Sequence, residues 1–318
     1  MKTSTDLFPP IEPYEYGYLP VDNGHKIYYE QCGNRNGYPI LFIHGGPGAG
    51  CDKMDRRFFD PEKWKVILFD QRGSGRSKPF GSLKTNNTWA LASDIWTLRK
   101  ELGIEKFVLF GGSWGSTLAL VYSILYPRTV SGMVLRGIFL GEADEIDSFT
   151  NGSVALFRPQ VWERFIGPVP PEHKRNPYPY YRQQLNSDDP ETRKKFAYEW
   201  AFYEMSLLHL NPLPEEKISE ETTSFSFESL ALMETHYFAH NCFLEDRFII
   251  RNANCLPSVP ISIVQGDWDL VCPPISAYRL HKALPTSTLH MVLAGHSSSD
   301  PEIRKKLISE TDAMFDRV

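Results

Sequence analysis

The sequence predicts an α/β protein with a mostly parallel, doubly wound sheet and a helical cap inserted into it. Three observations predict this class. Short apolar segments alternate with helical patterns over the first 140 residues, the same alternation returns after residue 247, and the residues between are helical in period. Strands that alternate with helices pair in parallel, because each helix carries the chain back across a face of the sheet.

Six segments have the composition of buried strands. Each is too short for a helix, rich in Val, Ile, Leu and Phe, and followed by loop residues. They span residues 39–44, 65–70, 106–111, 131–139, 260–266 and 287–295.

Helices are predicted between these strands and after the last one. They span residues 88–102, 116–126, 275–284 and 301–315. Asn87 or Thr88 is expected to cap the first helix, and Pro127 ends the second, because proline cannot continue a helix.

Residues 141–247 interrupt the alternation. This segment is aromatic and Pro-punctuated, and 196–208 and 227–245 read as helices. It holds 19 Asp/Glu and 10 Lys/Arg, a net charge of −9, against +4 for the remainder. We therefore expect a core of 1–140 and 248–318 with an acidic cap that prefers cationic ligands, although ordinary charged helix surfaces would give the same count.

Composition excludes several classes of protein. The net charge of −5 provides no basic surface for nucleic acid. No window approaches the roughly 18 apolar residues of a membrane span, and the N-terminal residues have no apolar signal core. The five cysteines form no CxxC pair, which argues against a disulfide framework or structural zinc. A cytoplasmic protein without membrane or nucleic-acid partners is expected.

A candidate nucleophile lies in the motif Gly111-Gly112-Ser113-Trp114-Gly115, a GxSxG between a predicted strand and a predicted helix. A serine on such a sharp turn needs small neighbours, because its backbone is strained and approaches the adjacent chain closely. Gly111 and Gly115 meet that need. The following helix N-terminus also favours developing negative charge.

Acyl transfer also needs hydrogen-bond donors for the oxyanion. In a strand–nucleophile–helix arrangement, one donor is the N–H after the nucleophile, here that of Trp114. The other comes from the Gly-rich loop after the 39–44 strand. Gly46 is the expected donor, with Gly45 as the alternative.

A serine nucleophile needs a base and an orienting acid, in the chain order Ser, acid, His. Only His296, of the nine histidines, follows a C-terminal strand in a flexible loop, Ala-Gly-His-Ser. Asp267 and Asp269 both follow the 260–266 strand, and the spacing Gly-x-x-Asp-x-x-x-Pro favours Asp269.

Together the motifs resemble those of the proline iminopeptidase (prolyl aminopeptidase) family of the α/β-hydrolase superfamily. The resemblance rests on HGGPGAG, DQRGSGRS, GGSWGSTLAL, VLRGIF, GDWDLVCPP and AGHS. It implies an α/β-hydrolase fold and a serine exopeptidase, without metal or cofactor, that acts on peptides with a free N-terminal proline. It also assigns nucleophile, acid and base to Ser113, Asp269 and His296.

The resemblance further implies that two glutamates of the cap grip the substrate amine. The matching positions are Glu204 and Glu234. An N-terminal proline carries a secondary ammonium with two N–H donors, which paired carboxylates accept with charge assistance. Taken alone, each glutamate could equally be a solvated helix residue.

The same resemblance places Arg136 and Phe139 in the substrate pocket. Phe139, Tyr237 and Phe238 are candidates to wall the proline ring, although aromatic residues at helical spacing also form plain core. Two other functions stay open. One is an esterase- or lipase-like hydrolase of neutral esters, and the other is a non-catalytic ligand-binding protein on the same scaffold.

Overall fold

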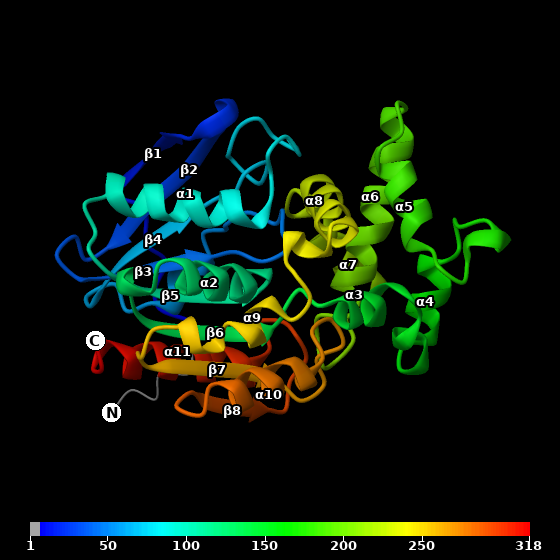
Figure 1. Cartoon of the computed structure of the whole chain (residues 1–318). Helices are drawn as coiled ribbons and strands as arrows, with labels where there is room; N and C mark the ends of the chain where they lie inside the picture. The colour runs from blue at the N-terminus through cyan, green and yellow to red at the C-terminus, as the bar shows by residue number, and fades with distance from the viewer. Residues whose placement is uncertain (1–6) are drawn as a thin grey trace.

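Eight strands form one sheet, with helices on both faces, in the computed structural model, which describes residues 7–318 (Figure 1). The strand order is β1-β2-β4-β3-β5-β6-β7-β8. The strands are β1 (Glu15–Pro20), β2 (Lys26–Gly33), β3 (Tyr38–Ile43), β4 (Trp64–Phe69), β5 (Phe107–Ser113), β6 (Val130–Ile138), β7 (Ile261–Gly266) and β8 (Thr288–Val292).

Strands β3 to β8 pair in parallel, which confirms the predicted class. β1 and β2 pair antiparallel and extend the sheet beside β4. The sequence analysis missed both. β1 is an edge strand with mostly exposed side chains, so it lacks the apolar run that marks a strand buried on both faces.

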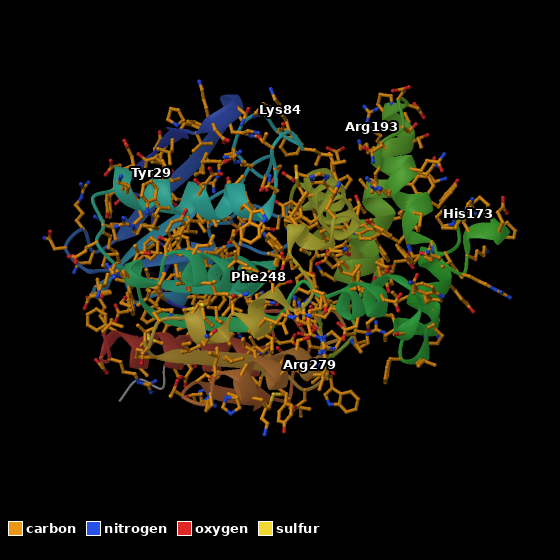
Figure 2. All side chains as sticks on the ribbon, viewed as in Figure 1. Tyr29, Lys84, His173, Arg193, Phe248 and Arg279 are labelled. Atoms are coloured by element: carbon orange, nitrogen blue, oxygen red, sulfur yellow. The ribbon has the colours of Figure 1, made fainter. Side chains whose placement is uncertain are left out.

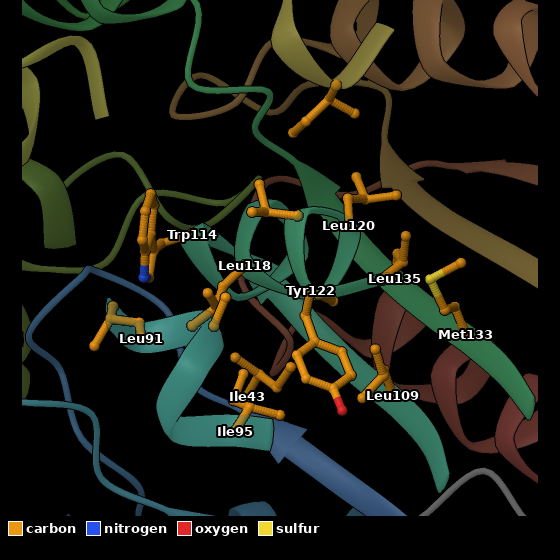
Figure 3. Close-up of a cluster of buried hydrophobic side chains, with 14 of the residues drawn as sticks. Ile43, Leu91, Ile95, Leu109, Trp114, Leu118, Leu120, Tyr122, Met133 and Leu135 are labelled. Carbon is orange, nitrogen blue, oxygen red and sulfur yellow. The ribbon is translucent and has the colours of Figure 1, made fainter. Parts of the chain in front are cut away.

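Two hydrophobic clusters hold the helices on the sheet. One cluster joins α1 (Thr88–Glu101), α2 (Trp114–Leu125), α9 (Phe248–Arg251) and α10 (Pro274–Ala283) to one face. The other joins α11 (Pro301–Phe315) to the opposite face. Figure 3 shows Leu118 and Tyr122 of α2 among Ile43 and Leu109 of the strands. α2, which follows the candidate nucleophile, is thereby anchored in the core.

The structure distinguishes the two expected caps of α1. The Asn87 side chain accepts a hydrogen bond from the N–H of Ala90 at 3.0 Å. The Thr88 hydroxyl instead donates to the carbonyl of Cys242. Asn87 is therefore the N-cap, and Thr88 ties α1 to the chain that returns from the helical segment.

Six α-helices follow β6 and lie together beside the sheet (Figure 1). Five of them share an aromatic cluster that includes Phe165, Tyr181, Trp200 and Tyr203. Figure 2 places Arg193 and His173 at the outer end of this group, away from the sheet. The helices are α3 (Ala143–Thr150), α4 (Pro159–Phe165), α5 (Tyr178–Leu185), α6 (Pro190–Met205), α7 (Glu215–Thr223) and α8 (Phe227–Ala239).

Two predicted boundaries in this segment are wrong. α6 begins at Pro190, because Asp189 caps it through the N–H groups of Glu191 and Thr192. The helix predicted at 227–245 ends at Ala239, because the backbone at 241–243 has φ between 48° and 55°. A left-handed run cannot continue a right-handed helix.

Short 3₁₀ helices complete the described chain, and none of the helices within residues 7–318 has both the length and the apolar character to cross a membrane. The 3₁₀ helices are η1 (Asp22–Gly24), η2 (Asp55–Phe58), η3 (Pro127–Thr129), η4 (Ser153–Leu156), η5 (Pro171–His173), η6 (Asn241–Phe243) and η7 (Ala253–Cys255).

Candidate active site

The candidate nucleophile Ser113 lies on a strained turn where β5 ends and α2 begins. Its backbone has φ 58° and ψ −128°, a conformation that non-glycine residues rarely adopt. A Cβ at Gly111 would lie 2.4 Å from the carbonyl oxygen of Gly115, and a Cβ at Gly115 would lie 2.1 Å from that of Ile43. The GxSxG glycines are therefore required by backbone contact.

His296 and Asp269 come together from the loops that follow β8 and β7. His296 Nδ1 lies 2.7 Å from Asp269 Oδ2, and both side chains are buried. Asp269 Oδ1 accepts the N–H groups of Val271 and Cys272 at 3.0 and 2.7 Å. Asp267, the alternative acid, is exposed. Of the two candidates, Asp269 is the one that contacts the histidine.

Arg136 forms a hydrogen bond with the other ring nitrogen of His296. Its Nη1 donates to His296 Nε2 at 2.9 Å and to the His296 carbonyl at 3.0 Å. With Nδ1–H donated to Asp269, these partners assign the neutral tautomer whose Nε2 is an acceptor. Burial, followed by the charge of Arg136, holds the pKa of His296 below its ordinary value despite Asp269.

The Ser113 hydroxyl faces Cys272 instead of the histidine. Its Oγ lies 3.8 Å from Cys272 Sγ, and within residues 7–318 no hydrogen bond joins Ser113 to His296. Both nevertheless line one cavity of about 760 Å³, together with Arg136. A Ser–His contact therefore requires Arg136 to leave Nε2 and the serine side chain to turn.

Both expected oxyanion donors lie beside Ser113. Gly46 lines the same cavity at φ 102°, and Gly45 is a close neighbour, since a Cβ there would lie 3.4 Å from Ser113 Cβ. Trp114 is the first residue of α2, so its backbone N–H has no partner within the helix. Its buried indole donates to Gln71 Oε1 at 2.8 Å, which braces the turn.

Glu204, at the end of α6, and Glu234, on α8, bring their carboxyl groups within hydrogen-bonding reach. Both are buried. Trp200 Nε1 donates to Glu234 Oε2 at 2.6 Å, whereas Glu204 Oε2 has no partner in the described chain. Burial raises the pKa of Glu204 to about 7, and burial with the charge of Glu204 raises the pKa of Glu234 further. Without a cation, the pair is expected to retain a proton.

A second, smaller cavity separates Glu234 from Ser113 and is mainly apolar. Phe139 and Phe238 line it, with ring centroids 6.1 Å apart. Phe149 also lines it and was missed, because one aromatic residue in a short helix gives no signal beyond core packing. The expectation for Tyr237 is corrected: it lines neither cavity, its hydroxyl donates to Asn86 at 2.8 Å, and its ring packs on Trp114.

Other supporting contacts lacked any sequence signal. Gln265, inside β7, donates from Nε2 to Asp269 Oδ2 at 3.0 Å and accepts the N–H of Ile138 at 2.9 Å. Trp200 lies one helical turn before Glu204 and holds Glu234 of another helix. Such contacts join residues that are distant in the chain, so only the folded arrangement reveals them.

Comparison with known proteins shows what the chain is similar to. A family model described as alpha/beta hydrolase fold matches residues 38–302. A probable proline iminopeptidase of Leptolyngbya boryana is 44% identical over 310 residues, which cover 96% of each chain. A proline iminopeptidase of Arabidopsis thaliana is 43% identical over 97% of this chain and 82% of its own.

Solved structures share the fold at lower identity. An esterase from Exiguobacterium antarcticum matches with a TM-score of 0.64 and 20% identity, over 95% of this chain and all of its own. A proline iminopeptidase-related protein from Thermus thermophilus matches with a TM-score of 0.61 and 20% identity, over 96% of this chain and 99% of its own. With the fold, the strained turn at Ser113 and these relatives in agreement, the chain belongs to the proline iminopeptidase family of α/β hydrolases.

Proposed function

We propose that the protein is a serine exopeptidase that releases proline from the N-terminus of peptides. The observation that carries this proposal is the pair of buried carboxyl groups, Glu204 and Glu234, each of which lines a cavity that reaches Ser113. The names of the relatives support the same substrate. A hydrolase of neutral esters would have no use for two buried acids beside its nucleophile.

The substrate amine is bound by the acidic pair. A prolyl N-terminus presents two N–H donors and one positive charge, and Glu204 Oε2 is an acceptor without a partner in residues 7–318. Both carboxylates can accept once the cation displaces their shared proton. An internal proline has neither N–H nor charge, which restricts cleavage to the chain end.

The acyl-enzyme then forms at Ser113. Once Arg136 leaves His296 Nε2, that nitrogen takes the hydroxyl proton while Oγ bonds to the prolyl carbonyl carbon. The N–H groups of Gly46 and Trp114 hold the oxyanion. His296 returns the proton to the leaving amine as the C–N bond breaks, and water then releases proline by the same steps. Asp269 stabilises the imidazolium.

We further propose that residues 141–247 form the recognition cap of a core composed of 1–140 and 248–318. This segment supplies Glu204, Glu234, Phe149 and Phe238, and it has an aromatic cluster of its own. A cytoplasmic location is also proposed, because the five cysteines are free thiols, as is usual in a reducing compartment.

Substrate dependence tests the function directly. A proline arylamide should be cleaved at least about 100-fold faster, in kcat/KM, than its N-acetylated form, because acetylation removes the charge that a buried pair would bind. Initial rates on both substrates and on a simple acyl ester measure this. Equal rates on the free and blocked amides, or a clear preference for the ester, would refute the proposal.

The acidic limb of the pH profile should follow the glutamate pair. The pKa of Glu204 is raised to about 7, so this carboxyl group becomes negatively charged only as pH rises through that region, whereas the pKa of His296 is lowered and is not limiting there. We expect kcat/KM to rise with pH up to about 7 and Glu204→Gln to remove this dependence. A limb unchanged in Glu204→Gln would contradict the assignment.

The raised pKa of Glu204 also makes the stability of the folded protein depend on pH in a definite direction. A carboxyl whose pKa is higher in the folded protein than in the unfolded chain binds more protons when folded. The free protein should therefore lose stability as pH rises from about 4.5 to about 7 on account of Glu204.

A further inference from the structure

The backbone of the His296 loop is bonded to the chain that follows α6. The N–H groups of His296 and Ser297 both donate to the carbonyl of Leu208, at 2.7 and 2.8 Å. Gly295 approaches the same segment so closely that a Cβ there would lie 2.7 Å from the oxygen of Leu208 and from the nitrogen of Leu210. The loop that carries the base is therefore packed directly on the segment 208–210.

Asp300 adds further bonds between the His296 loop and the segment 208–210, and we call this contact the junction. Its Oδ2 accepts the N–H of Gly295 at 2.7 Å and that of Leu210 at 3.1 Å, and its Oδ1 lies 2.9 Å from His209 Nδ1. Asp300 is the N-cap residue of α11, yet it makes no side-chain bond to that helix. An aspartate at this position normally accepts the N–H groups of the first turn. Here the buried carboxylate instead accepts a hydrogen bond from the loop before His296.

We propose that Asp300 and His209 are positioning residues that couple the substrate-binding helix α6 to the base His296. This inference rests on the proposed function. Glu204 lies four residues before Leu208, so a movement of the end of α6 reaches the loop that holds His296 through a short stretch of chain. Closure of the helices over a bound amine and orientation of the base are then one event.

Charge strengthens the junction at neutral pH. The charged groups that face His209 are Asp300 and, at 3.6 Å, Glu221 of α7. Hydrogen bonds to Asp300 and Glu221 raise the pKa of His209 to about 9. Burial opposes ionisation of Asp300, but bonds from His209 and two backbone N–H groups hold its pKa below the ordinary value. The ion pair is present from the lowered pKa of Asp300 up to about pH 9, and it is lost as His209 deprotonates above that pH.

Asp300→Asn tests the coupling, because it preserves the size of the side chain and removes its charge and one acceptor. Displacement of a catalytic group by about 1 Å costs about 10²-fold. We therefore expect kcat for a proline arylamide to fall by about 10- to 100-fold, with KM changed by less than about threefold. Glu302→Gln, an exposed residue in the first turn of α11, is the matched control and should leave both constants unchanged.

Labelling of Ser113 by a fluorophosphonate separates the junction from the proposed substrate, because that reagent has no amine. Its rate should fall in Asp300→Asn by the same factor as kcat, and asparagine-to-aspartate reversion should restore it. In the wild type the rate should also fall above about pH 9, and His209→Gln should lack this limb. His209→Gln also decides the question if Asp300→Asn does not fold.

The outcomes are distinct for the two proposals. If the wild type labels normally but does not cleave proline arylamides, the proposed function is wrong and the junction can still be judged from labelling. If the wild type cleaves them, but labelling and kcat in folded Asp300→Asn and His209→Gln match the wild type at every pH, the coupling is wrong. A loss of thermal stability with unchanged kcat and unchanged labelling would likewise reduce Asp300 to a structural residue.

Discussion

Ser113→Ala is expected to lower kcat/KM for a proline arylamide by about 10⁴-fold or more. Removal of the nucleophile leaves only substrate binding and oxyanion stabilisation, and in serine proteases this loss reaches about 10⁶-fold. Steady-state rates, with active-site labelling as an independent readout, measure the effect. Activity within tenfold of the wild type would remove the serine mechanism altogether.

The fold of that variant should be preserved. Within residues 7–318, the one hydrogen-bonding contact of the Ser113 hydroxyl is with Cys272 Sγ at 3.8 Å, so removing the hydroxyl breaks no strong hydrogen bond. Thermal unfolding should therefore remain close to that of the wild type. Ser309→Ala, on the exposed side of α11, is a matched control for serine truncation and should retain full activity.

Glu234→Gln and Glu204→Gln are expected to have the second largest effect, a loss of about 10²- to 10³-fold in kcat/KM on free-amine substrates. Removing one partner of a buried charge pair typically costs about 3–5 kcal/mol, and each 1.4 kcal/mol is tenfold. Glu234 should be the more sensitive position, because Trp200 fixes its orientation. Both carboxyl groups are buried, so water cannot replace the lost acceptor.

A simple acyl ester serves as the control substrate for these variants. It reacts through Ser113 and His296 but presents no ammonium, so its hydrolysis should be unaffected in either glutamine variant. The double variant should lose less than the product of the two single losses, because the two carboxyl groups act on one cation. Equal losses on ester and amide would instead indicate that the substitutions disturb the whole site.

The sequence predicted the parallel part of the sheet well, because β3, β4, β5 and β7 are largely buried and consist mainly of apolar residues. The same signal fails at the edge. β1 exposes most of its side chains and pairs antiparallel with β2, so neither strand had to be apolar throughout. The prediction also extended the helix at 227–245 beyond its real end, because composition does not reveal the left-handed turn at 241–243.

Part of the candidate site was likewise predicted from the sequence, and part was not. Ser113, Asp269 and His296 were predicted because each lies at or after the end of a strand in a motif with a physical requirement, such as the glycines that the strained turn at Ser113 needs. The hydrogen bond from Arg136 to His296 Nε2 was not predicted. The sequence also did not reveal that Tyr237 bonds to Asn86 and lies outside the cavity wall. These depend on which side chains meet once the helices pack.

By itself, the sequence determined the order of the six parallel strands and of the helices between them, the strained turn at Ser113 and the kinds of side chain available for chemistry. These are local properties, set by backbone sterics and by the burial of neighbouring residues. Only the tertiary structure decided that two carboxyl groups from α6 and α8 meet out of water, that Arg136 covers the base, and that Asp300 bonds the loop before His296 instead of its own helix. Each of these joins residues far apart in the chain, and the energy of a buried charge depends on what surrounds it in space.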